Sequence, residues 1–202
     1  MKQFLHVGCG GNAKEQAGPG FQGDEWQEIR FDINPAVKPD IIGTMTDMSA
    51  VENCSVDAIF SAHNIEHLYA HEVPLALAEF RRVLRADGFV VITCPDLQSV
   101  ARLIVDDKLA EPVYQSPAGP IAPLDIVYGL RSAIAQGNLF MAHRCGFTQK
   151  VLAETLQACG FGPAIVRQRA NYLDLWALAF KSPQSHAHLH MMARKHLPDQ
   201  FT

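Results

Sequence analysis

The sequence of 202 residues has no long hydrophobic run, and its opening residues, MKQFLHVGCG, reach glycine too early for a signal peptide. A membrane-spanning helix requires roughly 18 or more consecutive apolar residues. We therefore expect no membrane span and a cytoplasmic location.

Basic residues are also scarce, since 17 lysines and arginines stand against 21 aspartates and glutamates, giving a formal net charge of -4. Proteins that bind nucleic-acid phosphates usually carry a basic excess. This balance argues against a nucleic-acid partner. It leaves the oligomeric state open, with a homodimer as one alternative.

Cysteine is infrequent and scattered. The five cysteines are odd in number and never form a C-x-x-C pair. This pattern excludes the usual signatures of a disulfide framework and of a zinc knuckle. Hydrophobic residues make up 48% of the chain, enough for a core, and the length favours one domain.

Short apolar runs that stop at glycine or at polar residues predict seven strands, at residues 2–8, 26–33, 40–43, 56–63, 89–95, 163–169 and 175–181. Helical spacing predicts helices at 71–88, 96–110, 124–136 and 148–160, the first with Leu75 on its apolar face. Strands and helices that alternate in this way predict an α/β fold. We expect a doubly wound, seven-stranded, mostly parallel Rossmann-like sheet.

The second half of the chain interrupts this alternation. Four prolines occur in EPVYQSPAGPIAPL, which predicts irregular structure. We expect one domain over residues 1–181, with a helical and loop insertion at 108–145, before the last large helix, that covers the substrate. Residues 182–202 contain several histidines without a sustained period and are expected to be mobile.

The glycines of HVGCG follow the first predicted strand, where a missing side chain lets a ligand approach the backbone. Asp32 ends the second strand, where a carboxylate can accept hydrogen bonds from ribose hydroxyls. Together they predict a nucleoside ligand. Gly8, Gly10 and Ala13 also fit the dinucleotide pattern G-x-G-x-x-A, but Gly18-Pro19-Gly20 would break the helix that a pyrophosphate requires.

Six segments in this order resemble the class I S-adenosylmethionine-dependent methyltransferases: HVGCG, FDINP, TDM, VDAIFSAHNIEHL, EFRRVLRADGFVVITCPD and HRCGFTQKVLAETLQACGF. The resemblance covers roughly residues 4 to 181. It implies the class I methyltransferase fold and S-adenosylmethionine as cofactor, with S-adenosylhomocysteine as product.

The resemblance also implies positions for the cofactor. Gly8, Cys9 and Gly10 would lie beside its methionine part, Asp32 would hold the ribose, and Ile33 would lie against the adenine. His6 stands where the family often has a carboxylate near the ammonium group. The other side of the adenine would be bordered by residues of the segment 44–48, namely Thr44, Met45, Asp47 and Met48, with either the Thr44 hydroxyl or Asp47 as the polar contact.

Histidines supply the candidate catalytic groups. His63 ends the fourth strand beside the expected methyl group, and so serves as a cofactor contact and as a substrate contact or general base. His143 is expected to face the same cavity, with Arg144 as a possible clamp for an anionic substrate. His63, His67 and His71 would form a metal-binding face only on an unbroken helix, which Pro74 argues against, so no metal is expected.

The predicted function is methyl transfer to an unidentified acceptor, either a small molecule or a cell-surface precursor. A noncatalytic protein that binds the same cofactor as a sensor or partner subunit is an alternative. A nicotinamide-dependent oxidoreductase is a weaker one, because of the broken helix after the glycines.

Overall fold

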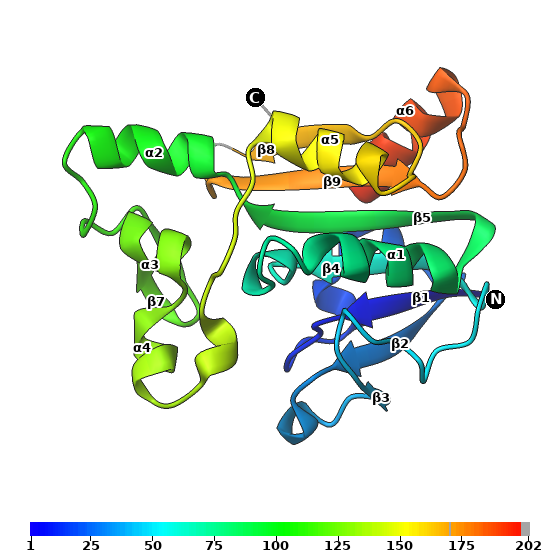
Figure 1. Cartoon of the computed structure of the whole chain (residues 1–202), viewed down its shortest axis with the longest axis horizontal. Coiled ribbons are helices and arrows are strands. Elements are labelled where there is room, and N and C mark those ends of the chain that lie inside the picture. The colour runs from blue at the N-terminus through cyan, green and yellow to red at the C-terminus, as the bar shows by residue number, and fades with distance from the viewer. Residues whose placement is uncertain (170, 199–202) are drawn as a thin grey trace.

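The computed structural model describes residues 1–169 and 171–198, and its centre is a twisted sheet with helices on both faces (Figure 1). The strands lie in the order β3-β2-β1-β4-β5-β9-β8, and β9 runs antiparallel to both of its neighbours while the other pairs are parallel. Their bounds are β1 Lys2–Val7, β2 Trp26–Asp32, β3 Ile41–Ile42, β4 Val56–Ala62, β5 Leu84–Pro95, β8 Ile165–Arg169 and β9 Asp174–Phe180. The predicted seven-stranded, mostly parallel fold is confirmed.

Two apolar layers cover the faces of the sheet because successive strand residues point to opposite sides. On one face, α1 (Val73–Val83) and α5 (Gln149–Ala158) pack against the odd-numbered residues of β1, such as Leu5. On the other, the 3₁₀ turn η2 (Pro19–Phe21) and α6 (His186–His196) pack against Phe4 and its neighbours. Both layers leave the carboxyl ends of the parallel strands free.

The connection from β1 to β2 contains no α-helix, only the 3₁₀ turns η1 (Lys14–Gln16) and η2. This agrees with the expectation that Gly18-Pro19-Gly20 would prevent a helix. A further 3₁₀ turn, η3 (Pro35–Val37), follows β2. The glycine turn after β1 therefore does not open into the helix that a dinucleotide pyrophosphate needs.

The insertion is more ordered than its proline content predicts. After α2 (Leu97–Val105), the strands β6 (Tyr114–Ser116) and β7 (Gly119–Ile121) form a hairpin within the segment expected to be irregular. The single helix expected at 124–136 is two, α3 (Pro123–Tyr128) and α4 (Arg131–Ala135), followed by the turn η5 (Leu139–Met141). They separate at Gly129, whose φ of 96° and close approach to the Met141 carbonyl admit no side chain.

Two other expectations are wrong. The helix expected at 71–88 ends at Val83, and β5 begins at Leu84, which pairs with Val56; Leu75 is exposed. Part of the tail expected to be mobile forms α6, capped by the Ser185 hydroxyl, which accepts a hydrogen bond from the His188 N–H. Positions 199–202 of that tail lie outside the described residues.

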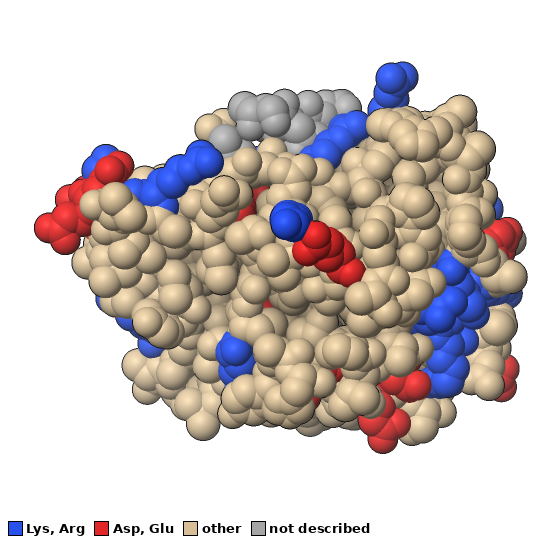
Figure 2. Space-filling model, turned by 45° about the horizontal axis from the view of Figure 1, so that its top comes forward, with Lys and Arg blue, Asp and Glu red and all other residues tan. Residues whose placement is uncertain are grey.

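Charged side chains are unevenly spread on the face shown in Figure 2, where lysines and arginines gather mainly near one edge, next to acidic residues. Most of that face carries uncharged side chains. Among the helices that the structure describes, none has the length and apolar character required to cross a bilayer.

Candidate functional site

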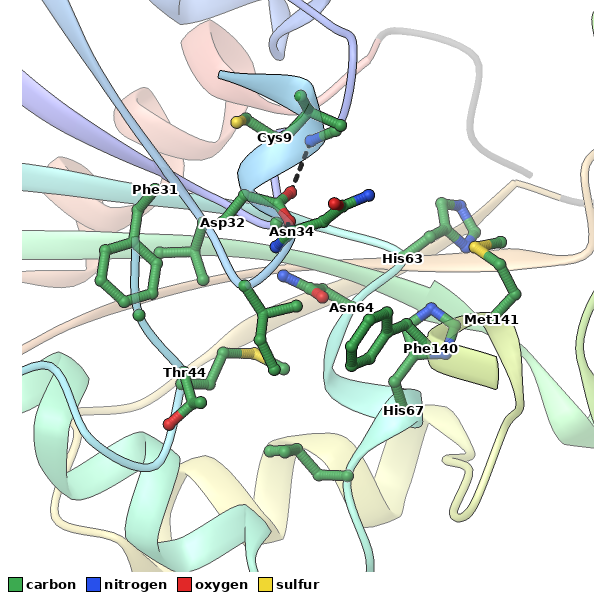
Figure 3. Close-up of a pocket in the computed structure, with 18 of the residues that line it drawn as sticks. Cys9, Phe31, Asp32, Asn34, Thr44, His63, Asn64, His67, Phe140 and Met141 are labelled. Carbon is green, nitrogen blue, oxygen red and sulfur yellow. Dashed lines mark hydrogen bonds between the residues drawn. The ribbon is translucent and has the colours of Figure 1, made fainter. Parts of the chain in front are cut away.

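Two adjoining pockets lie beyond the carboxyl ends of β1, β2 and β4. The first pocket, of about 390 Å³, is bordered by the ends of these strands, by residues 43–45 and by residues 138–144 of the insertion (Figure 3). The second pocket, of about 230 Å³, lies among the 3₁₀ turn η4 (Ile65–His67), the β6-β7 hairpin and α3. The two pockets share three lining residues, His63, His67 and Met141.

Asp32 holds the glycine turn at the floor of the first pocket. Its Oδ2 accepts a hydrogen bond from the Gly10 N–H at 2.7 Å, and its Oδ1 accepts one from the Asn34 N–H at 2.8 Å. Each carboxylate oxygen can accept a second bond, so the group keeps capacity for a ligand. Gly10 has a φ of 53°, and a Cβ built there would meet no atom within 4 Å, so its missing side chain leaves open space in the pocket.

Gly8 has a different neighbour. Its φ is 65°, and a Cβ at this position would lie 1.8 Å from Asn64 Nδ2. The side chain of Asn64 therefore occupies the space that the glycine leaves. Its buried Nδ2 has no hydrogen-bond partner among the described residues, although Asn64 lines the first pocket. A buried amide without a partner is costly, so this nitrogen is a candidate donor at the pocket.

The apolar side of the first pocket is formed by residues after β2 and β3. Ile33, Thr44 and Met45 line it, as expected, and so does Cys9. Asp47 and Met48 do not: Asp47 is exposed and accepts a hydrogen bond from the Ser49 N–H, whereas the Met48 side chain is fully buried in the core. Of the two expected polar contacts, only Thr44 is placed at the pocket.

His6 does not line the first pocket either. Strand alternation turns it to the face that carries Phe4, and its Nδ1 donates to Glu28 Oε1 at 2.6 Å. Burial lowers the pKa of His6 more than the hydrogen bond to Glu28 raises it. The expectation that His6 contacts the cofactor ammonium is therefore wrong.

His63 lies where the two pockets meet. Its Nδ1 is 3.4 Å from Glu66 Oε1, its Nε2 is 3.5 Å from Asp174 Oδ2, and its side chain is 48% exposed to the pockets. Burial lowers the pKa of His63, but Asp174 and Glu66 outweigh this and raise it to about 9. Both ring nitrogens are then protonated at neutral pH, so the group does not suit the role of a general base.

His143 and His67 border the second pocket from different segments of the chain. The Nδ1 of His143 donates to the Ile126 carbonyl at 2.8 Å, and the Nδ1 of His67 donates to the Ala142 carbonyl at 3.1 Å. Burial lowers the pKa of His143. His63 and His143 both line the second pocket, so the predicted juxtaposition of these two side chains is present.

Comparison with protein families finds one match, in which residues 5–92 fit the model described as a methyltransferase domain. This stretch contains the glycine turn, Asp32 and His63. Over this stretch the chain is similar to a methyltransferase domain.

Solved structures show the same methyltransferase fold. A methyltransferase from Methanosarcina mazei is 16% identical, with a TM-score of 0.58, covering 90% of this chain and 93% of the other. A protein from Pyrococcus horikoshii is 13% identical, with a TM-score of 0.60, covering 90% and 82%. The 1,6-didemethyltoxoflavin N1-methyltransferase of Burkholderia thailandensis, solved with S-adenosylhomocysteine, is 15% identical, with a TM-score of 0.56, covering 89% and 71%. No curated protein sequence matches.

Several residues of this site were not predicted. Asn64 follows His63 directly, and its position at the end of a buried strand was a usable signal. Met141 comes from the insertion, whose path only the fold reveals (Figure 3). Arg144, expected as a substrate clamp, borders the first pocket instead and lies over the Tyr69 ring at 4.9 Å.

Proposed function

We propose that this protein transfers a methyl group from S-adenosylmethionine to a small-molecule acceptor, with the cofactor in the first pocket and the acceptor in the second. The observation that carries the proposal is the junction of the two pockets, where His63, His67 and Met141 line both. A methyl donor and its acceptor must meet end to end, and two joined cavities allow this.

The first pocket has the groups that the cofactor needs. Asp32, held by two backbone N–H groups, would accept hydrogen bonds from the ribose hydroxyls. Ile33 and Met45 would pack against the adenine, with Thr44 at its edge. The unpartnered amide of Asn64 would donate to the carboxylate at the methionine end. These assignments use only residues that border the pocket.

The acceptor pocket is small and is bordered on one side by the insertion. Its volume of about 230 Å³ and its lining of Tyr114, Ile126 and Leu130 suit a compact, partly apolar molecule. The insertion would act as the predicted lid, since the β6-β7 hairpin and α3 border this pocket.

The bound cofactor supplies an electrophilic methyl group on a sulfonium, which needs little covalent assistance from the protein. The contribution of the chain is alignment and exclusion of water. His63 would lie at the boundary between the pockets, with its Nδ1 facing Glu66 and its Nε2 facing Asp174. His143 would border the acceptor, with its ring held in place by the hydrogen bond that its Nδ1 donates to the Ile126 carbonyl.

The test combines binding and turnover. Calorimetry should show micromolar binding of S-adenosylhomocysteine and no binding of NAD. A panel of small hydroxyl, amine and thiol acceptors is then screened for release of S-adenosylhomocysteine from S-adenosylmethionine. Ala118→Trp, at the rim of the second pocket, should abolish turnover and preserve cofactor affinity.

The matched control is Gln115→Trp, because Gln115 is exposed on the same hairpin and does not border the pocket. It should leave both properties unchanged. Absence of S-adenosylhomocysteine binding would refute the cofactor assignment. Binding without turnover of any acceptor would favour the sensor alternative, and turnover that survives Ala118→Trp would refute the second pocket as the acceptor site.

A further inference from the structure

A cluster beside the second pocket has the composition of a metal centre. Glu66, His67 and His143 each offer one ligand atom, and these atoms all lie within 4.8 Å of one another. Two histidines and one glutamate form a ligand set found in catalytic zinc sites. We propose that these three residues bind a divalent transition-metal ion, with zinc as the best fit.

Glu66 provides the strongest argument. The residue is fully buried, and neither carboxylate oxygen has a hydrogen-bond partner among the described residues. Its closest cationic neighbour is His63, whose Nδ1 lies 3.4 Å from Oε1 without hydrogen-bond geometry. A buried carboxylate is expensive unless it is paired or coordinates a metal. Glu66 borders the second pocket together with the two histidines.

Both histidines have the tautomer that a metal requires. A backbone carbonyl can only accept, so the Nδ1 atoms of His67 and His143 carry hydrogens, donated to Ala142 and Ile126. In the neutral ring, each Nε2 then has a free lone pair. Metal-binding histidines usually donate their other ring N–H to a carbonyl or carboxylate in this way.

The backbone fixes the two ligand-bearing segments to each other. The N–H groups of Arg144 and Cys145 both donate to the Glu66 carbonyl, at 2.8 Å and 3.2 Å. The rings of His67 and His143 meet edge to face, with centroids 4.9 Å apart. Ligands of one tetrahedral zinc ion lie about 3.4 Å apart. Closing the cluster therefore requires side-chain shifts on the order of 1 Å.

Other nearby histidines do not belong to the ligand set. Both nitrogens of His63 face carboxylates, so this ring can support Glu66 but offers no lone pair to a metal. His71 stacks on Tyr69, with centroids 5.8 Å apart. The predicted face of His63, His67 and His71 does not form, because η4 is a single 3₁₀ turn that ends at His67.

A metal here would border the acceptor pocket, where it could bind an oxygen, nitrogen or sulfur atom of the acceptor and lower its pKa. The site itself does not depend on methyl transfer. The test therefore measures binding of Co²⁺ by its visible absorption, followed by displacement with Zn²⁺. His186 and His190 lie one turn apart on α6, with ring centroids 5.3 Å apart, and could bind the metal adventitiously. All samples in this test are therefore the full chain with the substitution His190→Ala.

We expect one Co²⁺ per chain in this background, displaced by Zn²⁺. His67→Ala, His143→Ala and the isosteric Glu66→Gln should each weaken binding by on the order of 100-fold or more. His71→Ala is the control and should retain it. Zn²⁺ should also raise the thermal midpoint of the background chain and the control but not of the three variants, whose own cooperative unfolding transitions show that they are folded.

The proposal is overturned if the background chain binds no Co²⁺, if one equivalent survives His143→Ala, or if His71→Ala abolishes binding. Calorimetry with S-adenosylhomocysteine on the same samples separates this result from the proposed function. Failure to bind that ligand would refute the cofactor assignment and leave the metal site standing.

Discussion

Mild acid should destabilise this protein through His196 on α6. The side chain is fully buried, and neither ring nitrogen has a hydrogen-bond partner among the described residues. Its ring meets those of Phe21 and Phe89 with centroids 4.7 Å away in each case. Burial, reinforced by the charges of Lys195 and Lys2 and opposed by Glu25, lowers the pKa of His196 to about 3.

The direction of the effect follows from proton binding. Below the unfolded pKa of about 6.5, the unfolded chain takes up a proton at His196 that the folded chain does not, so stability falls as the pH falls toward about 3. Between about pH 7.5 and pH 5, this single group removes about 2 kcal/mol from the free energy of unfolding. The pKa of Glu25 is already lowered, by its own backbone N–H and by Lys195, so it stays ionised.

Urea unfolding at the two pH values measures the effect. His196→Leu should remove about 2 kcal/mol of the pH dependence, equivalent to on the order of 1 M in the urea midpoint. His190→Leu, at an exposed position on the same helix, is the control and should behave as the wild type. Equal acid sensitivity in the wild type and His196→Leu would refute the argument that His196 stays neutral in the fold.

Three further predictions concern the first pocket. Asp32→Ala should weaken S-adenosylmethionine binding in calorimetry and also lower the thermal midpoint, because the carboxylate holds the glycine turn; an unchanged midpoint would contradict this. Gly8→Ala should lower the free energy of unfolding, measured with urea, by about 2 kcal/mol or more. A second substitution, Asn64→Ala, should restore part of this loss, and no restoration would mean that backbone strain alone is responsible. His6→Phe should leave cofactor affinity unchanged, because His6 does not line the first pocket. A tenfold loss of affinity would show that His6 contributes to cofactor binding.

The central strands could be predicted because they are buried on both faces and end abruptly. β4 and the second half of β5 contain short apolar runs, at residues 58–60 and 89–92, that polar residues or glycine bound, and this pattern has few alternatives. The boundary at Leu84 could not be predicted, because this leucine extends the helical period of α1. Leu84 belongs to the strand because it pairs with Val56 on β4, and the local sequence does not indicate this contact.

The helix α6 was missed for a related reason. Its buried stripe consists of Leu189, Ala193 and Leu197, spaced four residues apart, with His196 beside them. Only two of these side chains are strongly apolar, so the period is weak in the sequence. The aromatic layer on the sheet, formed by Phe21, Phe89 and others, supplies the missing driving force through tertiary packing.

Site residues at strand ends were predictable, since parallel strands bring their carboxyl ends to one edge. Asp32, Ile33 and His63 follow this rule. His6 fails because alternation places it on the opposite face from Leu5 and Val7, which the sequence already indicated. Met141 could not be predicted, because the path of the insertion depends on the break at Gly129.

The two glycines that flank Cys9 serve different purposes. At Gly10, a side chain would enter open pocket space, so this position is glycine for backbone conformation and for the ligand. At Gly8, the space is filled by Asn64, which brings an unpartnered amide to the pocket. The turn therefore does more than expose backbone to a nucleoside. It also lets the end of β4 approach β1 closely enough to place a polar side chain where the cofactor carboxylate would lie.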